Sequence, residues 1–286
     1  MWSDQEARKR VESTEKTSKQ PVLLTIAGFD PSSGAGVTAD LQTFAAHGLF
    51  GVSAITALTI QSTQGVTAVH VTDPAWLTRT LEHLVADLPI AGVKIGMLGS
   101  EANVQAVARF LGPPSHRPPR IPVVFDPVLK ASSGHELLPP SARKRIQMEL
   151  LPRVTWITPN WSELEFLTGD TVKRIEQAPY AAERLGKRYP WLHVVVTGGD
   201  AREPVDLLRS PGGLLHAYQG RHVETTSTHG TGCAFSSALL SRLVRGDEPT
   251  AAVANAKAYV TEALRLAPGL GQGQGPLHLL WPLTST

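Results

Sequence analysis

The sequence predicts an α/β fold in which helices cover both faces of a mostly parallel sheet. Short apolar runs rich in valine, isoleucine and leucine recur along the chain, and such runs are typical of strands buried on both faces. Segments with the periodicity of amphipathic helices lie between them, and this alternation favours parallel pairing. Polar or glycine-rich segments follow most of the expected strands. Since ligands bind at the carboxyl ends of the strands in such sheets, we expect the functional site there.

Composition excludes several classes of function. The 286 residues suffice for one large α/β domain or two small ones. The chain has 27 lysines and arginines against 25 aspartates and glutamates, and this net charge of +2 indicates neither a nucleic-acid nor a membrane partner. No apolar run approaches the roughly 18 residues of a membrane span. Cys233 is the only cysteine, which excludes an intrachain disulfide and is compatible with a reducing cytoplasm.

The first half of the chain shows the alternation clearly. Residues 1–20 are polar and lack the apolar core of a secretion signal, so we expect a disordered extension. Asp73 and Pro74 form a typical helix start, with aspartate as the N-cap and proline at the first helical position. The expected strands are 22–27, 52–60, 92–98 and 121–125, and the expected helices are 37–47, 73–87 and 101–111. The proline-rich residues 112–120 are expected to form a surface linker.

The second half continues the pattern and then departs from it. Residues 207–223 combine glycine-rich turns with short extended pieces, which predicts hairpins. The expected strands are 154–158 and 192–197, and the expected helices are 141–150, 162–168, 173–188, 234–244 and 249–266. Residues 223–226 partly alternate in polarity and favour a β-strand. The glycine- and proline-rich residues 268–286 are expected to pack loosely.

Residues 228–233 (THGTGC) have the character of an anion-binding site. A glycine-rich turn that opens a helix presents free backbone N–H groups and the positive end of the helix dipole. Cys233 lies in the first helical turn, where the pKa of a thiol tends to be lowered. An anion cradle beside a proton acceptor is what phosphoryl transfer to a hydroxyl needs. On spacing alone, a plain helix start with an inert buried cysteine is an equally good interpretation.

Six sequence blocks, in order along the chain, resemble one family. They are residues 25–36 (TIAGFDPSSGAG) with 39–41, residues 56–63 (TALTIQST), residues 94–98 (KIGML), residues 126–128 (DPV), residues 157–160 (ITPN) with Glu163, and residues 228–233. The chain resembles the hydroxymethylpyrimidine/phosphomethylpyrimidine kinases of thiamine biosynthesis, within the ribokinase superfamily. The resemblance implies a three-layer α/β/α ribokinase-like domain over residues 21–286.

The resemblance also implies an activity. Such an enzyme uses ATP and Mg²⁺ to phosphorylate 4-amino-5-hydroxymethyl-2-methylpyrimidine and then its monophosphate. The partner is therefore a small molecule, and by analogy with relatives we expect a cytoplasmic homodimer.

The family pattern assigns catalytic roles to the stretch at 228–233. Cys233 is the base that takes the proton of the hydroxymethyl group, and Gly230, Thr231 and Gly232 supply backbone donors to the transferring phosphoryl group. A packing cysteine and a plain turn are the structural alternatives. His229 lies beside this stretch and receives no chemical role.

Four residues match the family's substrate contacts. Gln61 is the expected reader of the pyrimidine edge, because an amide offers a donor and an acceptor together. Asp40 matches a further contact, and Gly28 and Met97 match the pocket wall. The alternatives are a strand-end polar residue for Gln61, a solvated helix residue for Asp40 and a core residue for Met97.

Asp126 and Glu163 are the carboxylates expected in the metal–phosphate network. Asn160, Glu163, Thr197 and Gly199 are the expected ATP and phosphate contacts, although the spacing of Asn160 and Glu163 also fits a capping box. Residues 197–200 read TGGD where the family often has Lys-Gly-Gly-His, which puts the phosphate contacts in doubt. In addition, Lys130 does not stand at the position of the lysine that the family often has after the aspartate at 126. Residues 269–276 lack the histidine that the family has there.

Two other functions stay open on the sequence. A pyridoxal or pyridoxine kinase shares the fold, the use of ATP and a hydroxymethyl group on an aromatic ring, and one enzyme can accept both rings. A non-catalytic pyrimidine-binding sensor is the alternative from another class, motivated by the substituted lysine.

Overall fold

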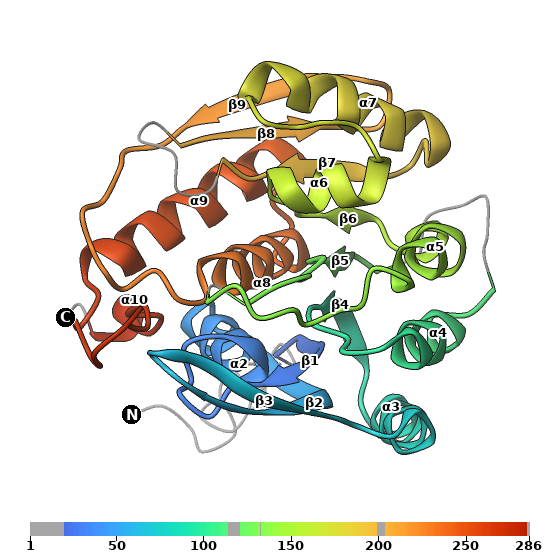
Figure 1. Cartoon of the computed structure of the whole chain (residues 1–286), viewed down its shortest axis with the longest axis horizontal. Helices are drawn as coiled ribbons and strands as arrows, with labels where there is room; N and C mark the ends of the chain where they lie inside the picture. Colours follow the sequence, from blue (N-terminus) through green and yellow to red (C-terminus); the bar gives the residue numbers. More distant parts are fainter. Residues whose placement is uncertain (1–19, 114–120, 132, 199–203, 285–286) are drawn as a thin grey trace, which may run out of the picture.

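The computed structural model describes residues 20–113, 121–131, 133–198 and 204–284. Its described strands form one nine-stranded sheet in the order β3-β2-β1-β4-β5-β6-β7-β8-β9 (Figure 1). Six neighbouring strands are parallel: β2 (Phe50–Ser62), β1 (Val22–Phe29), β4 (Ile90–Ile95), β5 (Val123–Phe125), β6 (Trp156–Ile157) and β7 (His193–Val196). The antiparallel strands are β3 (Gly65–Val71), β8 (Val205–Arg209) and β9 (Leu215–Gln219). The predicted mostly parallel sheet is confirmed.

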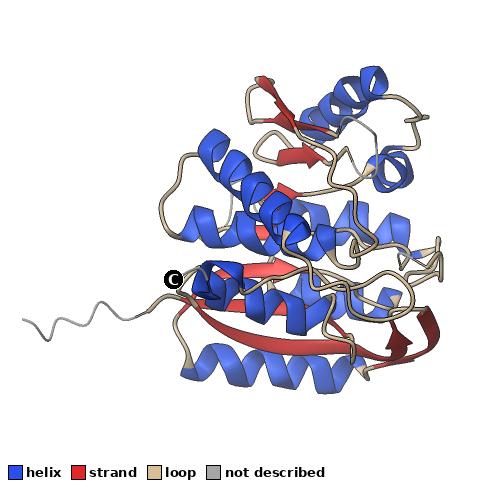
Figure 2. Cartoon of the chain, turned by 90° about the vertical axis from the view of Figure 1, so that its left-hand side faces the viewer, coloured by secondary structure: helices blue, strands red, loops and turns tan. Residues whose placement is uncertain are grey.

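Alternate residues of the central strands enter two separate cores, because successive side chains of a strand point to opposite faces. In β1, Leu24 and Ile26 belong to one core and Leu23 to the other. The first core is covered by α3 (Pro74–Asp87), α4 (Glu101–Phe110), α6 (Trp161–Thr168) and α7 (Ala178–Arg188). The second is covered by α2 (Gly36–Ala46), α8 (Thr231–Val244) and α9 (Pro249–Arg265). Helices therefore lie on both sides of the strands, which confirms the three-layer prediction (Figure 2).

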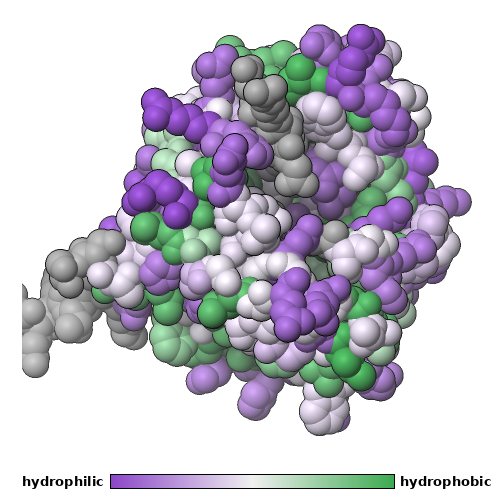
Figure 3. Space-filling view, turned by 60° about the vertical axis from the view of Figure 1, so that its left-hand side comes forward, coloured by the Kyte–Doolittle hydropathy of each residue, from purple (hydrophilic) through white to green (hydrophobic). Residues whose placement is uncertain are grey.

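Several local signals in the sequence are confirmed. Asp73 caps α3, since its carboxylate accepts hydrogen bonds from the backbone N–H groups of Ala75 and Trp76, and Pro74 follows it. The hairpin expected within 207–223 is formed by β8 and β9. The described helices include none long and apolar enough to cross a membrane. Hydrophobic residues on the face shown in Figure 3 occur in small groups between hydrophilic ones.

Other expectations are wrong in detail. β2 runs beyond residue 60 to Ser62 and turns into β3, which was not predicted because this edge strand has few buried side chains. Residues 223–226 form no strand. Residues 141–153 are not one regular helix but a helical turn, α5 (Ala142–Arg145), followed by a π-helix (Ile146–Leu150) and a 3-10 turn (Leu151–Arg153).

The C-terminal segment is packed, contrary to expectation. Leu277 and Leu279 are almost fully buried in the second core. The hydroxyl of Tyr259 in α9 donates a 2.6 Å hydrogen bond to the carbonyl oxygen of Leu279. A short helix, α10 (Trp281–Thr284), follows, so α9 is not the last helix. Nearly all of the extension 1–20 and of the linker 112–120 lies outside the described residues.

Candidate functional site

The carboxyl ends of the parallel strands surround a cavity of about 900 Å³, at the edge of the sheet where the sequence predicts the site. Its wall includes predicted site residues from β1, β2, the ends of β4 to β7 and the start of α8. These are Gly28, Gln61, Met97, Asp126, Asn160, Glu163, Thr197, Gly230, Thr231, Gly232 and Cys233. Asp40 does not line the cavity, and Gly199 lies outside the described residues.

Gly230 forms the turn that opens α8. Its φ of +85° favours glycine, and a Cβ atom there would lie 1.8 Å from the carbonyl oxygen of Gly34. The Thr231 hydroxyl donates a 2.7 Å hydrogen bond to the Thr228 carbonyl and fixes the turn. Among the described residues, the N–H groups of Gly232 and Cys233 have no backbone acceptor. They are available to an anion in the cavity, as expected for a helix N-terminus.

The Cys233 thiol lies beside these donors, and burial raises its pKa to about 12. The charges of Asp126 and Asp40 raise it too, while the charge of Lys94 and a hydrogen bond from the Gly36 backbone N–H lower it. The expectation that the helix N-terminus lowers this pKa is therefore wrong, because desolvation outweighs the local donors.

Asp40 forms a fully buried ion pair instead of a cavity wall. Its carboxylate lies 2.8 Å from Lys94 Nζ, and both side chains have no exposed surface. It also accepts hydrogen bonds from the hydroxyls of Thr25, at 2.6 Å, and Ser237, at 2.7 Å. These contacts connect β1, α2, β4 and α8.

Asp126 and Glu163 are buried carboxylates in the cavity wall. Burial raises the pKa of Asp126 to about 6, against the opposing effect of Lys94 and a hydrogen bond from the Ser236 hydroxyl. Burial raises the pKa of Glu163 to about 8, and the negative charge of Asp126 raises it further. Glu163 also forms the capping box with Asn160, which confirms the structural role predicted for this spacing. Glu163 lines the cavity as well.

This pair of carboxylates fits a magnesium ion held together with phosphates. Two buried like charges that disfavour each other's ionised form are stabilised by a cation between them. Among the described residues no group of three histidine, cysteine, aspartate or glutamate side chains converges on one point. Mg²⁺ needs no such cage, because it keeps several waters and uses one or two carboxylates plus phosphate oxygens.

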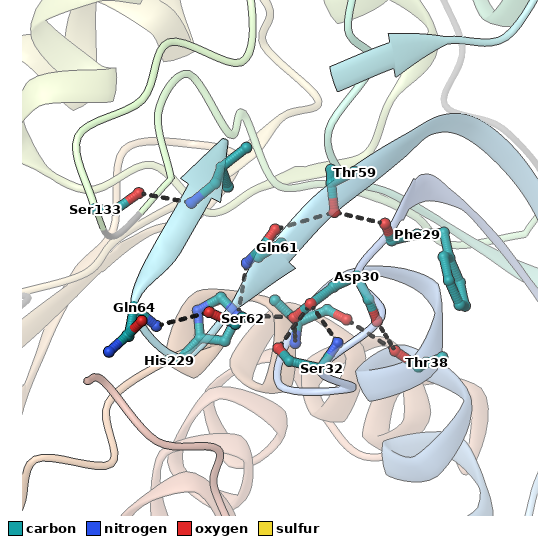
Figure 4. A network of polar contacts seen from close by, with 12 residues as sticks. Phe29, Asp30, Ser32, Thr38, Thr59, Gln61, Ser62, Gln64, Ser133 and His229 are labelled. Carbon is teal, nitrogen blue, oxygen red and sulfur yellow. Dashed lines mark hydrogen bonds and ion pairs between the residues drawn. The ribbon is translucent and has the colours of Figure 1, made fainter. Parts of the chain in front are cut away.

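A polar amide and a thioether lie at the β1–β2 end of the cavity. Gly28 allows the close approach of Met97, because a Cβ atom on Gly28 would lie 2.8 Å from the Met97 sulfur. Gln61 points toward His229, with 2.9 Å between Gln61 Nε2 and His229 Nε2 (Figure 4). The Thr59 hydroxyl lies 3.2 Å from the amide oxygen of Gln61. This end therefore combines a flat apolar wall with one donor–acceptor group.

The opposite end is formed by β6, β7, the β8–β9 hairpin and α9. Asn160 and Thr197 are joined by an isolated parallel bridge. The Gly198 N–H donates a 2.8 Å hydrogen bond to Asp206, which forms a 2.7 Å ion pair with Lys257 of α9. Asp206, Lys257, Val260 and Leu264 all line the cavity. The cavity is thus long enough to join two chemically different ends across the start of α8.

Sequence reasoning missed four residues of this arrangement: Lys94, Asp206, His229 and Lys257. Lys94 had a signal, since it is a charged residue inside an otherwise apolar strand, and such residues are rarely buried without a partner. Asp206, His229 and Lys257 gave no comparable signal, because their partners are distant in the sequence.

The chain is similar to known kinases. The family model of phosphomethylpyrimidine kinase matches residues 30–278. The hydroxymethylpyrimidine/phosphomethylpyrimidine kinase of Haemophilus influenzae is 39% identical over 266 residues, which are 90% of this chain and 95% of that protein. A bifunctional thiamine biosynthesis protein of Geobacter sulfurreducens is 39% identical over 90% of this chain. The chain spans about half (52%) of the length of that bifunctional relative.

Solved structures of two kinds of kinase share the fold. The pyridoxal kinase of Staphylococcus aureus in complex with ADP has a TM-score of 0.81 at 28% identity, covering 92% of this chain and 94% of that one. A phosphomethylpyrimidine kinase of Clostridium difficile has a TM-score of 0.72 at 35% identity, covering 85% of this chain and 99% of that one. Taken with the match over residues 30–278, these likenesses show that the chain belongs to the phosphomethylpyrimidine kinase family.

Proposed function

We propose that the chain transfers the γ-phosphoryl group of ATP to 4-amino-5-hydroxymethyl-2-methylpyrimidine, and then phosphorylates the monophosphate to the diphosphate. One observation carries the proposal: a single cavity joins the Gln61 amide, the free N–H groups at the start of α8 and the carboxylates of Asp126 and Glu163. The reaction requires a side chain that recognises the ring, backbone donors that bind the transferring phosphoryl group, and a site for the cation.

In the proposed mechanism the ring lies between Gly28, Gln61 and Met97, and its hydroxymethyl group points to Cys233. The thiolate form of Cys233 accepts the proton of that hydroxyl as the new P–O bond forms, and the bond between the γ-phosphorus and the ADP leaving group breaks. The N–H groups of Gly232 and Cys233 stabilise negative charge on the transferring group. Asn160 and Thr197 contact the nucleotide phosphates, and Gly199 is proposed to do the same.

Asp126 and Glu163 would hold Mg²⁺, which neutralises phosphate charge when bound. The negative charge of Asp126 helps to raise the thiol pKa of Cys233, and a cation held by Asp126 would offset this effect. The carboxylates thereby connect occupation of the nucleotide end to the proton-accepting ability of Cys233. Asp40 is proposed to act on the substrate only through Lys94 and the start of α8, since it does not line the cavity.

The test is to incubate the protein with Mg-ATP and the hydroxymethylpyrimidine and to separate mono- and diphosphate by chromatography. We expect both products from the wild type and at least about a hundredfold less from Cys233→Ala, because general base catalysis contributes 10²–10⁴-fold. Cys233→Ser is the matched variant that keeps the size of the side chain. Pyrimidine binding without ATP turnover would favour the sensor interpretation.

Pyridoxal kinase activity is the second candidate, since the S. aureus pyridoxal kinase has a TM-score of 0.81 with this chain. A direct competition between pyridoxal and the hydroxymethylpyrimidine separates the two. Exclusive phosphorylation of pyridoxal would overturn the substrate proposal and leave the kinase proposal intact.

We further propose a homodimer that acts in the cytoplasm. Leu58 and Ile60 of β2 pair with the edge strand β3 and expose 48% and 68% of their surface. Exposed apolar side chains that lie close together favour an interface between subunits. Light scattering on the purified protein gives the mass directly, and a monomeric mass at micromolar concentration would contradict the proposal.

A further inference from the structure

The carboxylate of Asp30 is almost fully buried, and both of its oxygens are already hydrogen-bonded. Oδ1 accepts from the backbone N–H of Ser32 at 2.9 Å and from its hydroxyl at 2.7 Å. Oδ2 accepts from the Ala35 N–H at 2.9 Å and lies 2.7 Å from His229 Nε2. Burial raises the pKa of Asp30, but the hydrogen bonds from His229 and Ser32 outweigh it and hold the pKa below its ordinary value. Asp30 is therefore ionised and can only accept.

The hydrogen on the imidazole of His229 is fixed by this contact. Because an ionised carboxylate has no hydrogen to donate, the short contact requires that His229 Nε2 carry one. The backbone of His229 and one edge of its ring have further contacts. Its backbone N–H donates to the Gly275 carbonyl at 3.1 Å, and its Cδ2 occupies the space of a missing side chain at Gly34, where a Cβ atom would lie 2.3 Å away.

The same nitrogen of His229 faces the end of the Gln61 amide at 2.9 Å (Figure 4). The oxygen and nitrogen of an amide have nearly the same shape, so hydrogen bonding decides which is which. An amide nitrogen at this position would oppose one N–H donor to another. An amide oxygen there instead shares the single Nε2 hydrogen with Asp30, in a three-centre hydrogen bond.

The other end of the amide supports this orientation. It lies 3.2 Å from the Thr59 hydroxyl, which is also 3.0 Å from the Phe29 carbonyl. With the amide nitrogen at this end, Gln61 donates to Thr59, and Thr59 donates to Phe29. No donor in the chain from Asp30 to Phe29 then faces another donor, which the opposite orientation does not achieve.

We propose that Asp30 and His229 hold the Gln61 amide with its oxygen toward His229 and its nitrogen toward Thr59, and so determine which way round an aminopyrimidine binds. The proposal rests on the proposed function for its substrate. The amide oxygen accepts from the ring's amino group on the His229 side, and the amide nitrogen donates to the adjacent ring nitrogen on the Thr59 side.

The orientation of the ring has a chemical consequence. The hydroxymethyl group is attached to the ring carbon next to the one that bears the amino group. An amino group on the His229 side therefore places the hydroxymethyl group on that side as well, where Gly230 and Cys233 line the same cavity as His229. A reversed amide would direct the hydroxymethyl group away from Cys233. Asp30 and His229 are thus positioning residues that act through Gln61.

The kinetic test compares the 4-amino substrate with its 4-oxo analogue, in which the ring edge presents an acceptor and an N–H in the opposite order. We expect the wild type to prefer the amino compound by at least about a hundredfold in kcat/KM, since an edge with unpaired polar groups is strongly rejected. His229→Leu frees the amide to turn, so this preference falls at least tenfold. His229→Gln keeps an N–H near the position of Nε2 and retains most of the preference. Equal losses for both compounds in His229→Leu, with the preference unchanged, would overturn the proposal.

A measurement without substrate tests the pair itself. The ¹⁵N spectrum of the wild-type protein distinguishes a histidine with hydrogen on Nε2 from one with hydrogen only on Nδ1. We expect Nε2–H for His229, and a ring with hydrogen only on Nδ1 overturns the proposal. If the wild type phosphorylates neither pyrimidine, the proposed function fails, and the spectrum still decides whether His229 carries the Nε2 hydrogen that the proposed amide orientation requires.

Discussion

Lys94 is the residue whose replacement should affect stability most sharply. Lys94→Met leaves Asp40 charged, fully buried and without its cation. Removal of one partner of a buried ion pair costs about 3–5 kcal/mol. Two donors to Asp40 survive the change, the hydroxyls of Thr25 at 2.6 Å and Ser237 at 2.7 Å. We therefore expect the lower end of that range, a loss of about 3 kcal/mol in the free energy of unfolding.

Denaturant unfolding of a double variant isolates the cause. Lys94→Met combined with Asp40→Asn removes both charges of this ion pair, while asparagine still bonds to both hydroxyls. We expect this double variant to be more stable than Lys94→Met alone. A loss below about 1 kcal/mol for Lys94→Met, or a double variant that is less stable than either single variant, would refute the reasoning.

The pH dependence of the same measurement has a definite sign. Burial lowers the pKa of Lys94, but the charge of Asp40 outweighs it and raises the pKa above its ordinary value. A group with a raised folded-state pKa contributes its full stability below the pKa of the unfolded state, about 10.4 for lysine, and loses it as pH rises through the folded value. Lys94 itself should therefore add no slope to the pH profile of the wild-type free energy of unfolding between about pH 6 and pH 9.

Three further predictions concern the site. Because burial raises the pKa of Asp126 to about 6, kcat/KM should fall as pH drops below that value, and Asp126→Asn should abolish the inflection; a flat wild-type profile would contradict this. Glu163→Gln should raise the Mg²⁺ concentration for half-maximal activity roughly tenfold at fixed ATP, and an unchanged requirement would remove Glu163 from the cation site. Gly36→Ala should lower the free energy of unfolding by more than about 1 kcal/mol, since φ is +62° and the new Cβ atom would lie 2.2 Å from the Gly28 carbonyl oxygen. Gly112→Ala, at φ +89° with open space around it, is the control that has backbone strain alone.

The parts of the fold that the sequence predicts are those with local causes. The Asp73 cap of α3 depends on two adjacent residues, and the buried strands β1 and β4 depend on short apolar runs. β3 was missed because an edge strand needs little apolar surface, and its side chains are half-buried or exposed. The C-terminal segment was judged loose from its glycines and prolines, but Leu277 and Leu279 are sufficient to bury it against α9.

The candidate site also has features that the sequence predicts and features that it does not. Connectivity alone brings Gln61, Asp126 and the start of α8 to one edge, because parallel strands all end there. The hydrogen bonds between these segments are not visible in the sequence. Asp30 and His229 are 199 positions apart, and Asp40 and Lys94 are 54 apart. Such pairs depend on side-chain distances that only the folded chain specifies. The family pattern therefore predicts Asp40 at the substrate, whereas the structure pairs it with Lys94 outside the cavity lining.

The loop after β1 contacts both the residues proposed to recognise the ring and the residue proposed to accept the proton. Its first residue, Asp30, fixes His229 and through it the ring reader, while the N–H of Gly36, where α2 begins, donates to the Cys233 thiol. Gly34 lies between them, in contact with both His229 and the Gly230 turn. A displacement of this loop must therefore change ring recognition and proton transfer together. A change at Asp206 or Lys257, which lie at the other end of the cavity, should affect the nucleotide alone.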